Sequence, residues 1–269
     1  MKFIHSFYLG DCKDDMKIYI NQICFVLSCL CIKKLGYDID LHCDDNMYNY
    51  LKIAPYNNIY RDLNDLKQPK RIYAKSKFDV MSKEDLGNIH IDGDVFLLKN
   101  DIKSYLDFDG YDLIVQGKET RENMGGYLWN ESSYAFKNCE YPSWANRKCE
   151  FMYNCGVVGI NNEDLKSEYF ETYYTMLQRY INNGIDLGSV PDIIIEQQFL
   201  YDLCNSRGYK VKVLLDEDDL DESARKIGYS HLMGPSKYNM REDILKMIYK
   251  LDKNIYLKIK EFWNGRIFK

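Results

Sequence analysis

The sequence contains little proline and no proline- or serine-rich stretch, so nothing in it indicates a long disordered segment or a linker. Only 5 of its 269 residues are proline, and its charged fraction of 29% is ordinary for a folded protein. A chain of this length can bury a sizeable core. The composition therefore excludes a mainly disordered protein and predicts one large domain or two small ones.

An excess of basic residues is also missing. The chain has 36 Lys and Arg against 41 Asp and Glu, which gives a formal net charge of −5. A nucleic-acid-binding protein of this size normally carries a basic excess that neutralises phosphates. We therefore expect no nucleic-acid partner.

Signals for secretion or membrane insertion are weak. The first residues, Met1–His5, lack the pattern of a signal or transit peptide. The longest apolar run, Ile23–Ile32, has ten residues, about half of a membrane span, and predicts a buried helix instead. We expect a cytoplasmic protein.

Cysteines are present, but no CxxC pair is found among the nine. An odd number in a chain that is long enough to fold without disulfides favours scattered reduced thiols. A zinc site built from Cys139, Cys149 and Cys155 is an alternative, although their spacing does not match known zinc ribbons.

Segments with strand and helix patterns alternate along the chain, which predicts an α/β fold with mainly parallel strands. Asp14 or Asp15 is expected to cap the first helix, and Gly36 to end it. Strands are expected at 2–8, 39–43, 89–91, 95–98, 113–116, 157–160 and 211–215, and helices at 16–35, 46–51, 72–81, 165–182 and 193–203. The acidic run 216–222 is expected to be a solvated loop.

The C-terminal stretch 241–269 differs in composition, with eight Lys and Arg against four Asp and Glu in a helical pattern rich in aromatics. A basic amphipathic helix of this kind can lie on a membrane surface, here the inner membrane face. The interpretation we favour is a terminal helix that packs on the domain and keeps its lysines in water. We divide the chain into a domain at 1–240 and this tail at 241–269.

The strongest local motif is a pair of carboxylates, Asp92 and Asp94, separated by Gly93 after an apolar strand. Side chains two residues apart in an extended segment point the same way, and two neighbouring negative charges are unfavourable without a cation. Gly93 would allow a phosphate or metal to approach the backbone. The pair predicts a divalent ion that bridges phosphates. An acidic turn between two short strands is the alternative.

A second motif lies far downstream, where His231, Gly234 and Lys237 are spaced by three residues each. The imidazole would complete the coordination of a metal, the glycine would let the chain approach a ligand, and the ammonium would neutralise a diphosphate. A nitrogen ligand beside carboxylates shifts the preference from Mg²⁺ toward Mn²⁺. Taken alone, the histidine would be an ordinary hydrogen-bonded surface residue.

Together, the Asp92-Gly93-Asp94 and His231-x-x-Gly234-x-x-Lys237 segments resemble the DxD and HxxGxxK motifs of retaining GT-A glycosyltransferases of glycosyltransferase family 8. The chain also resembles a group of short bacterial proteins that share the IDGD strand. The resemblance runs from about residue 1 to residue 240. It departs from the family after Lys237, where Tyr238 and Asn239 replace the usual Pro-Trp.

Further residues resemble the family in the same order along the chain. Lys75, seventeen residues before Asp92, matches a basic residue near the donor. Asn154 opens a stretch like the family's N-x-G-hydrophobic strand, and Glu196 with Gln197 resembles its acidic-Gln pair at the start of a helix. Two residues of the opening strand are placed like those that frame the nucleotide base, namely Phe7 and Tyr8.

The resemblance implies a GT-A fold, a single mostly parallel sheet with helices on both faces, and a metal-dependent glycosyltransferase. A hexose would pass from a nucleotide sugar, UDP-hexose by family default, to a glycan or other hydroxyl acceptor with retention. Asp92, Asp94 and His231 would hold Mn²⁺ or Mg²⁺. Asn154, Glu196 and Gln197 would lie near the sugar.

Two other classes of protein fit parts of the pattern. A non-catalytic module that binds sugar nucleotides or glycans would keep the same fold. A phosphohydrolase of the haloacid dehalogenase kind also places DxD after a strand, but its pattern has Thr or Val where this chain has Phe96.

Overall fold

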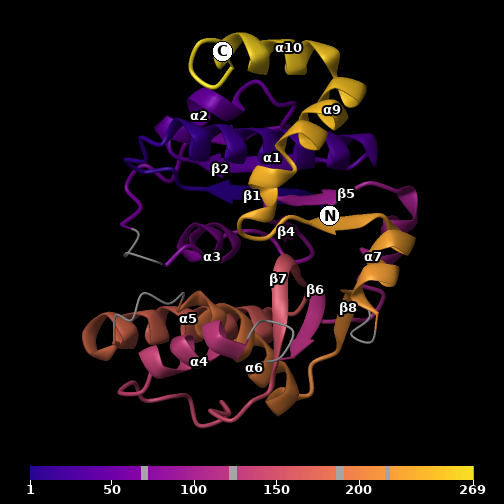
Figure 1. Ribbon diagram of the computed structural model, residues 1–269. Coiled ribbons are helices and arrows are strands. Elements are labelled where there is room, and N and C mark those ends of the chain that lie inside the picture. Colours follow the sequence, from indigo (N-terminus) through magenta and orange to yellow (C-terminus); the bar gives the residue numbers. More distant parts are fainter. Residues whose placement is uncertain (68–71, 121–125, 186–190, 216–218, 269) are drawn as a thin grey trace. The chain divides into compact units, whose positions relative to one another are not determined.

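The computed structural model describes residues 1–67, 72–120, 126–185, 191–215 and 219–268, with the side chains of 126–128 left aside. The chain forms two compact units. Unit 1 comprises Met1–Leu66, Ile89–Ser104 and Ala224–Lys269, and unit 2 comprises Lys67–Asn88 and Tyr105–Ser223. Each unit contains strands of the sheet with helices packed beside them (Figure 1).

Unit 1 contains four parallel strands in the order β3 (Ile59–Tyr60), β2 (Ile39–Cys43), β1 (Phe3–Phe7) and β4 (Ile89–Ile91). A separate antiparallel pair joins β5 (Val95–Leu97) to β9 (Tyr229–His231). Its helical elements are α1 (Asp15–Lys34), α2 (Asp45–Leu51), α8 (Ser236–Asn239), α9 (Arg241–Leu251) and α10 (Lys253–Phe262), and the 3₁₀ segment Asn100–Tyr105 follows β5.

Helix α1 is a buried helix of unit 1, as its apolar composition predicts. The side chain of Asp14 caps it by accepting a hydrogen bond from the Lys17 N–H at 3.0 Å, and Gly36 follows its end with a φ of +82°. Among the described helices, α1 alone is long and apolar enough to cross a membrane, but 83% of its apolar window is buried in the structure. That burial is typical of a core helix.

Unit 2 contains three strands in the order β7 (Phe151–Ile160), β6 (Leu113–Thr120) and β8 (Val211–Leu215). The β6–β7 pair is antiparallel and the β6–β8 pair is parallel. Its helices are α3 (Lys75–Met81), α4 (Gly126–Ala135), α5 (Glu163–Asn183), and a π-helical turn (Ile193–Gln198) that continues as α6 (Phe199–Arg207). The predicted α/β class with mostly parallel strands is confirmed.

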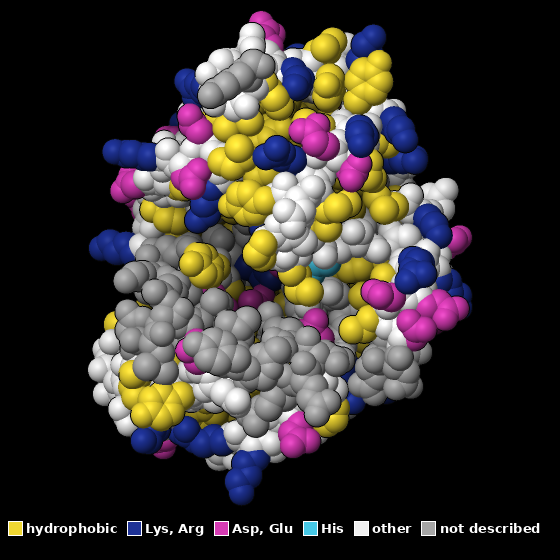
Figure 2. All heavy atoms as spheres, in the orientation of Figure 1, with side chains coloured by type: hydrophobic (Ala, Val, Ile, Leu, Met, Phe, Trp, Pro, Cys, Tyr) yellow, Lys and Arg dark blue, Asp and Glu magenta, His cyan; other side chains and the backbone are white. Residues whose placement is uncertain are grey.

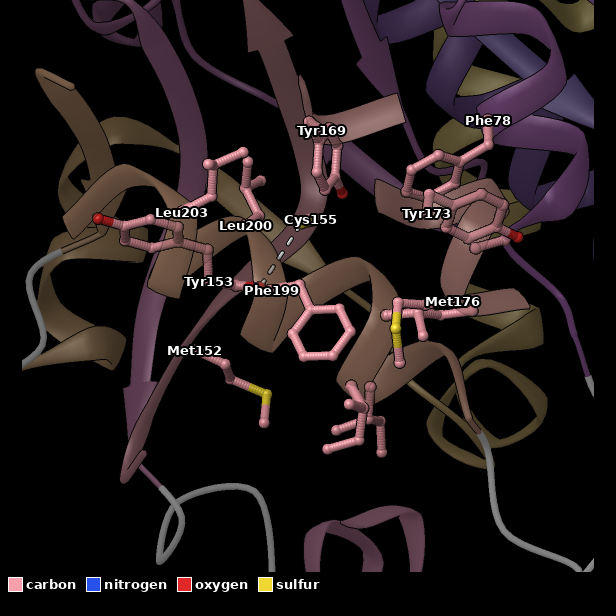
Figure 3. Packing of buried hydrophobic residues seen from close by; sticks show 14 of the residues in the cluster. Phe78, Met152, Tyr153, Cys155, Tyr169, Tyr173, Met176, Phe199, Leu200 and Leu203 are labelled. Atoms are coloured by element: carbon pink, nitrogen blue, oxygen red, sulfur yellow. Dashed lines mark hydrogen bonds between the residues drawn. The ribbon is translucent and has the colours of Figure 1, made fainter. Parts of the chain in front are cut away.

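The core of unit 2 is rich in aromatic rings and methionines (Figure 3). Phe78 from α3 stacks on Tyr173 from α5, with ring centroids 3.4 Å apart and planes 9° from parallel. Phe199 packs in the same cluster as Met152 and Met176. These contacts fix α3 and α5 against each other and so determine where the polar residues of α3 lie.

The C-terminal helices pack against the rest of unit 1. Helix α9 contacts α1, and the buried face of α9 and α10 is formed by Ile244, Leu245, Ile248, Ile255 and Ile259. Trp263 is fully buried, and its indole N–H donates to Gln22 Oε1 at 2.6 Å. On the face drawn in Figure 2, basic and acidic side chains are interspersed rather than gathered by sign. The packed-helix interpretation is therefore the one that this geometry supports, and the boundary at residue 240 stays a prediction.

The structure corrects several predicted segments. Helix α3 begins at Lys75 and not at residue 72. Part of the acidic run is helical and not a loop, because α7 (Leu220–Ile227) begins there; Asp219 accepts the Glu222 N–H at 2.9 Å, and acidic side chains favour a helix N-terminus. Residues 216–218 of that run lie outside the described residues.

Candidate functional site

The two motifs of the sequence meet in unit 1. Asp92 follows β4 and Asp94 precedes β5, while His231 is the last residue of β9. The antiparallel register pairs Val95 with His231, and the Leu232 N–H donates to the Asp94 carbonyl at 3.0 Å. This pairing carries a residue from far along the chain to the carboxylate pair.

Asp92, Asp94 and His231 form a cluster of donor atoms that all lie within 4.8 Å of one another. Each side chain is partly buried. Two carboxylates and one imidazole are a donor set that suits a divalent cation such as Mn²⁺. Within the part of the chain that the structure describes, no other three His, Cys, Asp or Glu side chains bring their ligand atoms this close together. The cysteines considered for zinc are not in it.

Lys237 contacts the same cluster through Asp94. Its Nζ lies 2.8 Å from Asp94 Oδ2, and His231 Nε2 lies 3.4 Å from Asp94 Oδ1. Burial alone would raise the pKa of Asp94, but its hydrogen bonds and ion pairs with His231 and Lys237 hold that pKa well below its usual range. Asp94 is therefore a carboxylate at neutral pH.

The two glycines of the motifs, Gly93 and Gly234, have different surroundings. A Cβ on Gly93 would overlap the ring of Phe25, so this position needs a glycine for packing against α1. Gly234 has a φ of +58° and open space where a Cβ would lie. Only Gly234 therefore leaves room beside its backbone for a ligand.

Phe7 is the last residue of β1 in the same unit, and Tyr8 follows it. Phe7 packs edge-on against Phe25, with ring centroids 5.1 Å apart. The next residues are held by Asp44, whose carboxylate accepts the Leu9 N–H at 3.3 Å and the Gly10 N–H at 2.8 Å. These two hydrogen bonds fix the loop after β1, where the sequence predicts contacts to a nucleotide base.

The remaining predicted site residues lie in unit 2. Asn154 is buried on β7; its Nδ2 donates to Glu119 Oε1 at 2.7 Å, and its Oδ1 accepts the Gly156 N–H at 2.9 Å. Gln197 sits in the π-helical turn, and its Oε1 is buried with no hydrogen-bond partner among the described residues. Asn154 is thus held rigidly, while the Gln197 amide oxygen retains its capacity to accept a hydrogen bond.

The sequence pattern does not predict that a buried lysine, Lys77, lies beside Glu196. Lys75, the predicted basic residue, pairs with Asp79 one helical turn away at 2.6 Å. Lys77 is the residue whose Nζ donates to Glu196 Oε1 and to the Cys155 carbonyl, both at 2.8 Å. No sequence signal separates the two lysines, because their difference is set by how α3 packs.

Asp192 is expected to make the stability of unit 2 depend on pH. Burial, and then the charge of Glu196, raise the pKa of Asp192 to about 7, against roughly 4 in the unfolded chain. The folded state therefore keeps this proton as pH rises from 4 to 7, and the free energy of unfolding falls over that window by about 4 kcal/mol. Asp192→Asn keeps an acceptor for the Tyr73 and Ala74 N–H groups and should remove this contribution to the fall.

Urea unfolding at pH 4.5 and pH 8 measures this difference for the wild type and the variant. Asp85→Asn, which changes an exposed carboxylate of the same unit, is the matched control and should keep the wild-type pH dependence. An Asp192→Asn protein whose free energy of unfolding depends on pH as the wild type's does would contradict the assignment.

The model of a family described as "Family of unknown function (DUF6734)" matches residues 1–262. No curated protein matches the chain. A solved structure of the galactosyltransferase LgtC in complex with donor and acceptor sugar analogues is similar at 12% identity, covering 99% of this chain and 100% of that chain, with a TM-score of 0.49.

Two further solved structures are similar at 13% identity. The mouse xyloside xylosyltransferase 1 covers 80% of this chain and 84% of its own, with a TM-score of 0.41. The inositol-1-phosphate CTP transferase from T. maritima covers 97% of each chain, with a TM-score of 0.47.

Proposed function

The chain belongs to DUF6734, a family of unknown function, and we propose that it is a metal-dependent glycosyltransferase with a GT-A fold. It transfers a hexose from a nucleotide sugar, a UDP-sugar in the first instance, to a glycan or other hydroxyl acceptor with retention of configuration. The observation that carries the proposal is the cluster of Asp92, Asp94 and His231 with Lys237 beside it.

The charges of this cluster support a diphosphate ligand. Asp92 and Asp94 bring negative charge that a divalent cation would offset, and Lys237 adds a positive charge for phosphate oxygens. Desolvation lowers the pKa of Lys237, but the charge of Asp94 and their hydrogen bond more than offset this and raise it. Lys237 therefore stays an ammonium under all ordinary conditions.

Each of these side chains has a task in glycosyl transfer. Asp92, Asp94 and His231 would hold Mn²⁺ or Mg²⁺, which when bound supplies Lewis-acid stabilisation of the leaving diphosphate. Lys237 adds a preorganised positive charge where negative charge develops, and the open backbone at Gly234 admits the phosphates. The loop after Phe7 and Tyr8 is proposed to contact the base.

The sugar-side residues are proposed from the resemblance. Asn154 and Glu196 are proposed to orient hydroxyl groups, since both are held by buried hydrogen bonds. Gln197 is proposed to position the sugar through its amide oxygen rather than to act as a nucleophile, because a neutral amide is a poor one.

A thermal shift with UDP tests the proposal. UDP at one hundred times its Kd stabilises the folded state by about 2.7 kcal/mol, which raises the Tm of a domain of this size by about 5 °C or more. We expect this shift with UDP and Mn²⁺, a smaller one with Mg²⁺, and none with EDTA.

The alternatives give different results. A shift without any turnover of UDP-hexoses would indicate a non-catalytic sugar-nucleotide module. Absence of a shift with UDP, GDP, CDP and dTDP, together with hydrolysis of a phosphate monoester, would replace the proposal with a phosphohydrolase.

A further inference from the structure

A buried histidine lies directly behind the first carboxylate of the cluster. The parallel register of β1 and β4 pairs Ile4 with His90, so Ser6, two residues further along β1, points to the same face as His90. His90 Nε2 lies 2.8 Å from Ser6 Oγ, and both side chains are buried. A polar pair at this depth in a sheet replaces apolar packing, and such a replacement costs free energy unless hydrogen bonds compensate.

The other ring nitrogen of His90 faces Asp92. The two residues are separated by one position, so their side chains leave the extended segment on the same side. His90 Nδ1 lies 3.7 Å from Asp92 Oδ1; the imidazole is 2% exposed and the carboxylate 34% exposed. The distance exceeds a hydrogen bond by about half an ångström, which a small rotation of the exposed carboxylate removes.

We propose that Ser6 and His90 are positioning residues that orient the carboxylate of Asp92 for the cation. Ser6 donates to Nε2, which leaves the proton on Nδ1, and the Nδ1–H group faces Asp92. A carboxylate held in this way loses less rotational freedom when a cation binds. The inference rests on the proposed function, since it requires the cation site.

Two amide substitutions separate the role of each ring nitrogen. Asparagine places an amide group near the position of Nδ1, whereas glutamine reaches the position of Nε2 and leaves Asp92 without a donor. We expect His90→Gln to weaken Mn²⁺ binding by about 10- to 100-fold and His90→Asn to retain most of the affinity. Ser6→Ala should weaken binding less than His90→Gln, because it removes only the group that fixes the tautomer.

His5 supplies a matched control in β1, the strand that carries Ser6. It is as buried as His90, but its ring nitrogens lie 2.8 Å from Tyr56 Oη and 3.1 Å from Ser28 Oγ, on the side of Phe25 from α1. His5→Gln should therefore lower the Tm as a core substitution does and leave the Kd for Mn²⁺ unchanged.

The measurement is the Kd for Mn²⁺ of the protein alone, from electron paramagnetic resonance of the free ion, without nucleotide. A wild type that binds Mn²⁺ and a folded His90→Gln variant that binds it equally well would overturn this inference and leave the proposed function standing. A wild type that does not bind Mn²⁺ would overturn both.

A second readout does not depend on any variant's folding. Long-range ¹H–¹⁵N correlation spectra of the wild-type histidines report which ring nitrogen carries the proton. We expect a proton on Nδ1 of His90. A neutral ring with its proton on Nε2 would overturn the inference, because Asp92 would then face an acceptor.

Discussion

Asp94→Asn should lower metal-dependent turnover by about a thousandfold or more while the protein stays folded. Asparagine keeps the shape of the side chain and one acceptor oxygen for Lys237, but it removes the charge that both the cation and Lys237 require. It also removes a charge that the folded state stabilises, since the pKa of Asp94 is held below its usual range, so the free energy of unfolding should fall as well. Turnover is therefore compared at a temperature at which circular dichroism shows the variant to be folded, so that the remaining loss reports on catalysis.

Initial rates of UDP release from a UDP-hexose, with Mn²⁺ varied, measure this loss. Asp65→Asn, an exposed carboxylate of the same unit, is the control for a charge change alone and should keep wild-type rates. An Asp94→Asn protein with wild-type turnover would remove Asp94 from the site, and the metal assignment with it.

The framework of the fold was readable from the sequence because its strands are short apolar runs between turn residues. The predicted bounds of β2 and β8 match the structure residue for residue. The predicted strand at 157–160 is the apolar end of β7, which starts at Phe151. Its first half contains Asn154, a residue type that is depleted in strands, and pairing with Gly117 of β6 holds it there.

The candidate metal cluster was readable as a set of residue types, but the way in which these residues meet was not. Asp92, Asp94 and His231 were predicted as ligands from the two motifs. The element that unites them, the β5–β9 pair, has only three residues in each strand, and β9 was not predicted. Strands so short have no periodicity to detect, so their pairing is a property of the folded chain.

Buried polar groups were the least readable part of the sequence. His90 stands between two isoleucines and Lys77 in the polar first turn of α3, and both are satisfied by partners that are distant in the sequence. Such partners appear only when the strands and helices are assembled. The packing requirement at Gly93 could not be predicted from the sequence either, because its neighbour Phe25 is contributed by α1.

Gly93→Ala should destabilise the protein by about 3 kcal/mol, because overpacking in a close-packed interior forces neighbouring groups to move. The added Cβ would overlap the ring of Phe25, which is itself wedged edge-on against His5 and Phe7. The ring therefore has no simple way to turn aside. Urea unfolding of the variant and the wild type measures the difference in the free energy of unfolding.

A double-mutant cycle shows whether the clash is the cause. Phe25→Leu removes the ring and should destabilise the wild type by leaving a cavity, but it should make room for the Cβ of Gly93→Ala. We therefore expect the double variant to be more stable than the sum of the two single losses predicts, by 1 kcal/mol or more, since residues in contact couple by about that amount. Strict additivity would mean that the glycine is required by something other than Phe25, and a ligand approaching the backbone at Gly93 would then become the better explanation.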